Sequence, residues 1–219
     1  MFLLSELEED ALKEFFNLGL GMAADSLSQM VHNEVLLKLP KLKVVPYEEA
    51  TRMLSAGQDE KLVAVRQTFK GELMGTALLV FPGSESLELV RTLLSEDMAL
   101  EVLAELEQET LLDVGNVILN AFLESFTQML RLEFEFEEAE FLRGSSRFLL
   151  DITSHVAVQG DELVEQATDN DRAFVLMMDF KTSDEENTQH TLSGFVVLLF
   201  SKPAMLTLKR ELALILANL

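Results

Sequence analysis

Residues 10–21 of the chain read DALKEFFNLGLG, and this stretch decides the fold. Its apolar residues recur every three or four positions, and the same period continues as far as Val31. That period is typical of a helix that buries one face. Ser5 stands three residues before Glu8, which is the spacing of a capping box. The sequence therefore predicts a long helix from about Ser5 to His32.

A polar strip runs along this predicted helix. Asp10, Glu14 and Asn17 are spaced by four and three residues, so they share one helical face, and Gly21 continues the strip. Inside a helix, Gly19 and Gly21 each cost about 1 kcal/mol relative to alanine. We expect a close approach, by a partner or by a neighbouring helix, to compensate. By spacing alone, such a strip is usually a solvated helix face.

The chain repeats itself after 99 positions. Residues 109–116 read ETLLDVGN, and this shift places Asn17 on Asn116 and residues 29–30 on residues 128–129 with identical letters. Later, residues 74–81 (MGTALLVF) match residues 193–200 (SGFVVLLF). Two helix–strand units could look alike through composition alone, but a true repeat is favoured because polar positions match as well as apolar ones. We expect one domain over residues 1–219, made of two repeats at about 1–97 and 98–219.

The remaining patterns predict an α/β (α+β) fold, in which a pseudo-two-fold relates the halves and one antiparallel sheet is backed by two long and two short helices. In chain order, the expected elements after the first helix are an edge strand Glu34–Val45, a hairpin of Lys61–Phe69 and Glu72–Phe81 joined at Lys70–Gly71, a short helix Ser84–Leu94, a long helix Met98–Leu130, strands Arg131–Phe141, Ser146–Val158, Arg172–Phe180 and Thr191–Phe200, and a closing helix Pro203–Asn218. Two acidic insertions, residues 159–171 and 182–189, are expected to be solvated loops.

Composition excludes several classes of function. Seventeen Lys and Arg against thirty-eight Asp and Glu give a net charge of −21, which argues against nucleic acid and anionic membrane as partners. The chain has no Cys, so it has no disulfide and no thiolate metal site. No apolar run reaches the length of a membrane span, and the first ten residues lack the basic region of a secretory signal. We therefore expect a cytoplasmic protein. Its three histidines have no ligand spacing, so no metal site is expected.

Pro40 extends the polar strip into a longer pattern, because it stands twenty-three residues after Asn17. The pattern Asp/Ser-x3-Glu-x2-Asn-x22-Pro resembles the signature of the CheC/CheX/FliY family of response-regulator phosphatases, with matches at Asp10, Glu14, Asn17 and Pro40. Residues 14–28 look most like the corresponding helix of CheC, and the duplicated layout covers nearly the whole chain, as in CheC. The resemblance implies a CheC-like fold.

The resemblance also implies an activity, the hydrolysis of aspartyl phosphate on a phosphorylated CheY-type receiver domain in chemotaxis or related two-component signalling. The same resemblance implies that Asn17 orients the attacking water and that Glu14 pairs with the lysine beside the receiver's phosphorylation site. An amide suits this task because it both donates and accepts hydrogen bonds without adding charge. The Mg²⁺ ion belongs to the receiver, so the chain needs no cofactor of its own.

A second site is implied at Asp113 and Asn116, but it departs from the family pattern. Asp113 is one methylene shorter than the expected Glu, Glu109 replaces the leading Asp or Ser, and Ala139 replaces the Pro. Whether this site is active stays open. The first site departs once, at Phe16, where Gly is usual. That ring either contacts the partner or packs inward.

Other readings stay open beside the enzyme. The chain could be a receiver-binding or adaptor module of the same fold with little turnover, or an unrelated acidic protein whose motif match is accidental. The family resemblance allows CheD as a further partner, although no residues here show such an interface. Because both long helices belong to one chain, we expect a monomer.

Overall fold

The computed structural model describes residues 4–31, 34–55, 61–94, 99–156, 172–183, 189–200 and 202–217. Its helices are α1 (Glu6–Val31), α2 (Tyr47–Ser55), α3 (Gly83–Leu94), α4 (Leu100–Leu130), α5 (Ser146–Val156) and α6 (Lys202–Leu216). Its strands are β1 (Val35–Pro46), β2 (Leu62–Gly71), β3 (Gly75–Pro82), β4 (Phe134–Phe136), β5 (Glu140–Gly144), β6 (Arg172–Ser183) and β7 (Gln189–Phe200).

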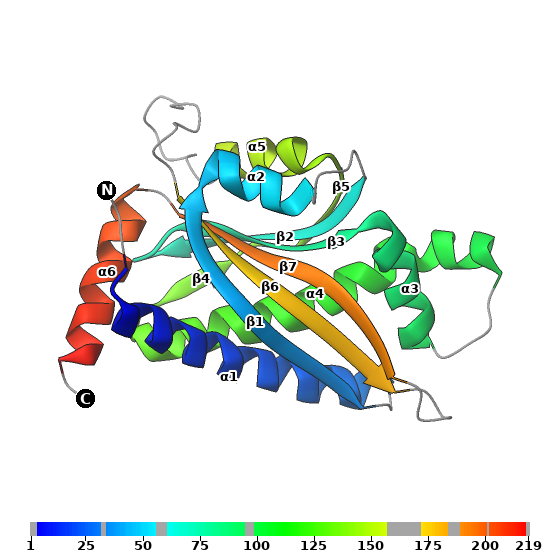
Figure 1. Cartoon of the computed structure of the whole chain (residues 1–219), viewed down its shortest axis with the longest axis horizontal. Coiled ribbons are helices and arrows are strands. Elements are labelled where there is room, and N and C mark those ends of the chain that lie inside the picture. The colour runs from blue at the N-terminus through cyan, green and yellow to red at the C-terminus, as the bar shows by residue number, and fades with distance from the viewer. Residues whose placement is uncertain are drawn as a thin grey trace.

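The seven strands form one antiparallel sheet in the order β1-β6-β7-β3-β2-β4, and β5 also pairs with β2. The long helices α1 and α4 lie together across one face of the sheet, and the short helices α2 and α5 cover part of the other face (Figure 1). Each face has its own hydrophobic cluster: the larger lies under α1 and α4, and the smaller under α2 and α5. The predicted fold class is confirmed.

The order of the elements repeats along the chain. The series helix, strand, helix, two strands, helix occurs twice, once from α1 to α3 and once from α4 to α6 if β4 and β5 count as one broken strand. The central pair of the sheet is β3 and β7, one from each series. On either side, the first strand of one series pairs with the hairpin strand of the other, because β1 pairs with β6 and the broken strand pairs with β2. The two series therefore exchange their edge strands.

The exchanged strands also repeat a defect in register. In β1 the pairing with β6 shifts between Lys38 and Lys41, around Pro40. In the second series the strand is interrupted at residues 137–139, which are the positions 99 residues later. The Cα partners on the two sides of the break are Leu37 with Phe180 and Lys41 with Met177 in one series, and Phe136 with Phe69 and Glu140 with Arg66 in the other. The same irregularity therefore occurs at equivalent places.

The start of α1 confirms the predicted capping box. The backbone N–H of Ser5 donates to Glu8 Oε2 at 2.6 Å, and the N–H of Glu8 donates to Ser5 Oγ at 3.3 Å. Farther along, the buried face of α1 packs against α4, which runs in the opposite direction (Figure 1). The Phe16 ring stacks on Phe122 with ring centres 4.6 Å apart and on Phe126 at 5.7 Å. This aromatic contact holds the two long helices together.

The strand predicted for Ser146–Val158 is wrong, because residues 146–156 form helix α5. Ser145 precedes it, and its Oγ accepts a hydrogen bond from the N–H of Phe148 at 3.2 Å, which is an N-cap. Leu149 and Leu150 are buried in the smaller hydrophobic cluster. Helix α2, which lies at the equivalent place in the first series, was not predicted at all.

Two smaller corrections concern strands. The stretch Arg131–Phe141 is not one strand but β4 and the start of β5, separated by three residues. The hairpin turns at residues 72–74, after β2 has continued through Lys70 and Gly71. The other predicted helices and strands are confirmed within a few residues. The predictions for His32, for residues 157–171 and 184–188, and for the side chains of His155 and His190 lie outside the described residues.

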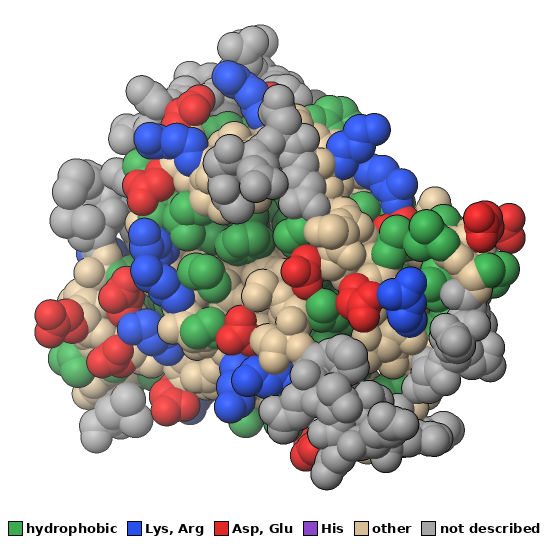
Figure 2. Space-filling model, turned by 45° about the vertical axis from the view of Figure 1, so that its right-hand side comes forward, with side chains coloured by type: hydrophobic (Ala, Val, Ile, Leu, Met, Phe, Trp, Pro, Cys, Tyr) green, Lys and Arg blue, Asp and Glu red, His purple; other side chains and the backbone are tan. Residues whose placement is uncertain are grey.

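The net charge of the chain is −21, and acidic and basic side chains mix on its surface. In the face drawn in Figure 2, Lys and Arg side chains alternate with Asp and Glu side chains along the left side, next to an apolar area. Within the described ranges, no helix combines the length and the apolar character that crossing a membrane requires.

Candidate functional site

The polar strip predicted on the first helix lies on the surface of α1. Asp10, Glu14 and Asn17 are all exposed. Lys13 lies within ion-pair distance of Asp10, with Nζ 3.5 Å from Oδ1. Among the described residues, neither Glu14 nor Asn17 has a hydrogen bond or an ion pair with another side chain. A carboxylate and an amide one turn apart are therefore available to a second molecule.

The two glycines of α1 have different surroundings. A Cβ added at Gly19 would lie 2.4 Å from Ser125 Oγ and 3.0 Å from Phe122 Cα, so this glycine admits the neighbouring helix α4. A Cβ added at Gly21 would meet nothing within 4 Å. No neighbour in the described structure therefore explains Gly21, which is exposed and lies on the strip with Asn17.

Phe16 packs inward, which resolves the alternative left by the sequence. Its side chain is fully buried against α4. At the equivalent position of α4, a Cβ added at Gly115 would come within 2.5 Å of the Val65 side chain. At this equivalent position, α1 therefore has a buried phenylalanine ring, whereas α4 has a glycine that lets strand β2 approach the helix. Neither residue contributes to the exposed strip.

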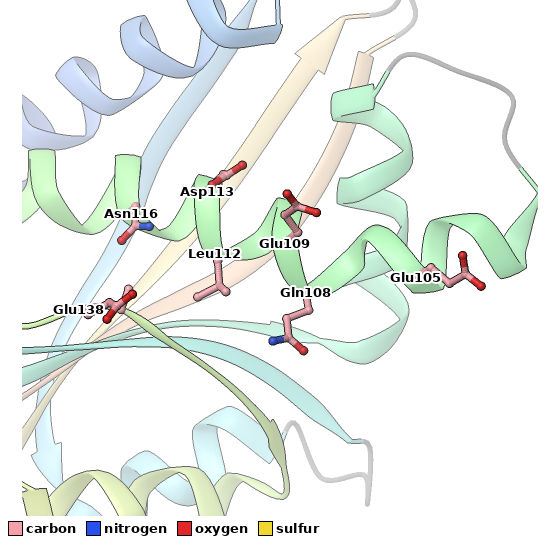
Figure 3. Close-up of a pocket in the computed structure, with 8 residues that line it drawn as sticks. Glu105, Gln108, Glu109, Leu112, Asp113, Asn116 and Glu138 are labelled. Atoms are coloured by element: carbon pink, nitrogen blue, oxygen red, sulfur yellow. The ribbon is translucent and has the colours of Figure 1, made fainter.

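The second candidate site lies in a hollow of about 430 Å³ beside α4. Its lining combines α4 residues with two residues between β4 and β5: Glu105, Gln108, Glu109, Leu112, Asp113, Asn116, Glu138 and Ala139. Figure 3 shows Glu138 projecting from the segment between the two strands, next to Asn116 of α4. Asp113 is exposed and Asn116 is half-buried. The structure thus brings Asp113, Asn116 and Ala139 together.

Glu138 is a site residue that the sequence reasoning missed. It adds a fourth carboxylate to a hollow that already contains Glu105, Glu109 and Asp113, and none of the described Lys, Arg or His residues lines it. The repeat could have pointed to it, because Glu138 stands 99 residues after Leu39, next to the position that replaces the family's proline. Interpreting that position required knowing that the strand is broken there.

A buried amide supports the segment on which Glu138 lies. Gln67 of β2 is 3% exposed, and its Nε2 donates to Asn120 Oδ1 at 2.8 Å and to the backbone oxygen of Glu137 at 3.5 Å. Asn120 lies one turn after Asn116 on α4. These hydrogen bonds connect α4, β2 and the β4–β5 segment, so they fix the position of the hollow's wall relative to the helix.

The described residues contain no group of three or more His, Asp or Glu side chains placed to hold a metal ion. What both places offer is an accessible carboxylate and an accessible amide on one helix. Such a pair can accept a hydrogen bond or an ion pair from a second molecule through the carboxylate, and can orient a polar group or a water through the amide.

Comparison with known proteins finds a relative in sequence, although no family model matches the chain. The chain is 22% identical over 133 residues to the CheY-P phosphatase CheC of Bacillus subtilis (strain 168). This match covers 59% of the chain and 63% of CheC. The matched region therefore spans less than two thirds of the relative's length.

Comparison with solved structures supports the fold over nearly the whole chain. FliY of Thermotoga maritima superposes with a TM-score of 0.68 at 15% identity, covering 97% of this chain and 98% of that one. The FliM middle domain from H. pylori superposes with a TM-score of 0.58 at 11% identity, covering 96% and 99%. At these identities the two structures establish a shared fold.

Proposed function

We propose that the chain is a member of the CheC/CheX/FliY family and that it hydrolyses the aspartyl phosphate of a phosphorylated CheY-type receiver domain; its sequence likeness to CheC and its structural likeness to FliY support this. The single observation that carries the proposal is the exposed pair of Glu14 and Asn17 on α1. This pair recurs, with Asp for Glu, as Asp113 and Asn116 on α4. A relative in sequence, CheC, is itself a CheY-P phosphatase.

The proposed chemistry needs little beyond positioning. The Asn17 amide accepts from and donates to one water, which holds the water in line with the bond between phosphorus and the aspartyl oxygen. Attack forms a new P–O bond, the aspartyl carboxylate leaves, and the water's protons pass to phosphate and solvent. A second carboxylate in place of the amide would repel the phosphoryl group.

Glu14 has a separate role in this proposal. Its exposed carboxylate pairs with a cationic side chain of the receiver, as the family resemblance implies, and so fixes the receiver relative to Asn17. The Mg²⁺ that neutralises the phosphoryl oxygens is brought by the receiver. Gly21 leaves open space at the next turn, where a receiver backbone can approach the helix.

The test is phosphate release from CheY-type receivers phosphorylated with acetyl phosphate in the presence of Mg²⁺. We expect the unmodified chain to accelerate release and Asn17→Ala with Asn116→Ala together to reduce that acceleration roughly 100-fold, the scale of a lost positioning contact. Gln29→Ala and Gln128→Ala are matched controls, because these equivalent residues are exposed on the same two helices but lie off the strip. Full activity in the double variant would refute the amide mechanism.

A non-catalytic module is the second candidate, and the shared fold with the FliM middle domain favours it. In that case the chain binds the phosphorylated receiver or a larger regulatory complex, and the lifetime of the phosphoryl group is unchanged. Binding measured by titration, with unaltered decay in the phosphate assay, would identify this case.

Two proposals about partners follow from the same premise. We propose that the chain acts as a monomer, because strands from both series complete one sheet within a single chain. Sedimentation at micromolar concentration tests this. Binding of CheD is a proposal on family resemblance alone, and mixing the two purified proteins tests it.

A further inference from the structure

The two candidate sites lie at equivalent backbone positions but differ in charge. The inference drawn from this difference rests on the proposed function. The positions correspond because the break in β1 and the break between β4 and β5 stand the same number of residues after Asn17 and Asn116, respectively. One turn before the asparagine stands Lys13 on α1 and Leu112 on α4. At the strand break stands Leu39 in the first series and Glu138 in the second.

These substitutions make the α4 site more acidic than the α1 site. At the α4 site, Leu112 and Glu138 both line the hollow, and its charged lining residues are all acidic. At the α1 site, the equivalent positions supply one cation, Lys13, and no added acid. Lys13 is half-buried and reaches toward Asp10 at 3.5 Å, so its ammonium group stays on the strip.

The flanks of the strand break differ in the same direction. Lys38 and Lys41 flank the break in β1, and neither has an ion pair with a described residue. At the equivalent positions of the second series stand Glu137, which pairs with Lys70, and Glu140, which pairs with Arg66. The break in β1 is therefore flanked by two positive charges without an ion-pair partner among the described residues, whereas the acidic residues that flank the other break are paired.

Glu138 lies between these two paired carboxylates but has no such cation of its own among the described residues. Glu138 is exposed, and within the described part of the chain it has no ion-pair partner. The wall of the α4 hollow therefore keeps one negative charge next to Asn116.

We propose that Lys13 and Glu138 decide which site works: the phosphorylated receiver is turned over at the α1 site, and Glu138 keeps the phosphoryl group away from Asn116 at the α4 site. A phosphoryl group carries close to two negative charges, so a neighbouring cation attracts it and a neighbouring carboxylate repels it. Inside a docked interface water is partly excluded, which strengthens both effects. Both residues are specificity-determining and neither performs the chemistry.

The experiment isolates each site and then exchanges its flanks. Asn116→Ala leaves only the α1 site, and Asn17→Ala leaves only the α4 site. In the Asn17→Ala background, Leu112→Lys with Glu138→Leu gives the α4 site the α1 flanks. In the Asn116→Ala background, Lys13→Leu with Leu39→Glu does the opposite. Phosphate release from the phosphorylated receiver is measured for each variant at low and high salt, and circular dichroism checks folding.

The expected result is a large asymmetry that the exchange reverses. Asn116→Ala keeps most of the turnover, and Asn17→Ala loses at least tenfold. The flank exchange restores severalfold turnover at the α4 site and lowers it by about tenfold at the α1 site. Rising salt increases turnover at the unmodified α4 site, because it screens repulsion, and decreases it at the α1 site.

Three outcomes overturn the inference or its premise, and they are distinguishable. If no CheY-type receiver is dephosphorylated by the unmodified chain, the proposed function fails. If both single-site variants turn over equally and the flank exchange changes nothing, the function stands and the inference fails. If Asp113→Glu alone restores the α4 site while Glu138→Leu does not, then side-chain length limits that site, and the charge argument is wrong.

Discussion

The hydroxyl of Ser125 on α4 faces Gly19 on α1 so closely that a Cβ at Gly19 would lie 2.4 Å from Ser125 Oγ. The same hydroxyl donates to the backbone oxygen of Phe122 at 2.8 Å, which fixes its direction. This contact lies beside the stacked rings of Phe16 and Phe122, so both belong to one region in which the two long helices approach closely. The helices that carry both candidate sites are positioned relative to each other here.

Gly19→Ala should destabilise the fold. The added methyl group has to displace Ser125 Oγ or push the helices apart, and overpacking of this kind costs about 1–3 kcal/mol. Chemical denaturation measures the loss in the free energy of unfolding. A double-mutant cycle with Ser125→Ala should give a non-zero coupling energy, because the hydroxyl is the atom in closest contact. Additive losses would contradict the proposed contact.

Gly21→Ala should have the opposite effect on stability. Its added Cβ meets nothing within 4 Å, and alanine is favoured over glycine in a helix by about 1 kcal/mol, so the free energy of unfolding should rise. If a receiver backbone approaches the helix at this turn, the same substitution should weaken receiver binding. Denaturation and a binding titration on one variant separate the two effects. Unchanged receiver affinity would show that Gly21 is not part of the interface.

Ser5→Ala should weaken the start of α1. The substitution removes the acceptor for the N–H of Glu8, and loss of an N-cap side chain costs about 1 kcal/mol. Thermal unfolding followed by circular dichroism measures the decrease. Ser26→Ala provides the control, because that exposed hydroxyl bonds only the backbone of its own helix, at Met22, and its loss should leave stability almost unchanged. Equal effects from both variants would rule out the capping role.

Tyr47 should make the protein sensitive to alkali. Burial, together with the hydrogen bond that its hydroxyl donates to Asp151, raises the pKa of the Tyr47 phenol far above its ordinary value of 10.0. The folded state therefore holds this proton more tightly than the unfolded state. Its contribution to stability is complete below pH 10 and decreases above it, by up to about 1.4 kcal/mol per pH unit.

The chain offers a clean measurement of this effect, because it has one Tyr and no Trp. Phenolate absorbance should therefore appear only as helical structure is lost during an alkaline titration. Tyr47→Phe should remove the part of the pH dependence that begins near pH 10. Phenolate that forms while the circular dichroism spectrum remains native would contradict the raised pKa.

The sequence predicted those elements whose signals are local. The capping residues Ser5 and Glu8 and the apolar period defined α1 almost to the residue, and the second long helix, predicted over Met98–Leu130, matches α4 within two residues. The prediction failed for residues 146–156, where neighbouring apolar residues such as Leu149 and Leu150 suit a buried strand as well as a short helix. The N-cap at Ser145 was the missed signal.

The candidate site was predictable only in part. Glu14, Asn17, Asp113 and Asn116 were selected by their resemblance to the family pattern, whose carboxylate and amide lie within a single helix; their spacing alone did not distinguish them from a solvated helix face. The wall that Glu138 forms beside Asn116 depends on how the broken strand pairs with β2, which is a contact between distant segments. The outcome at Phe16 also depends on a distant contact, since only the crossing of α4 shows that the ring faces inward.

The exchange of edge strands has a consequence for evolution and engineering. A lone copy of either series would expose an unsatisfied hairpin strand that only another copy could complete. A homodimer of a shorter ancestral chain, followed by duplication and fusion of its gene, would give this topology directly. Shortening the connection between α3 and α4 should therefore favour a domain-swapped dimer, in which the edge strand of each chain pairs with the hairpin strand of the other chain.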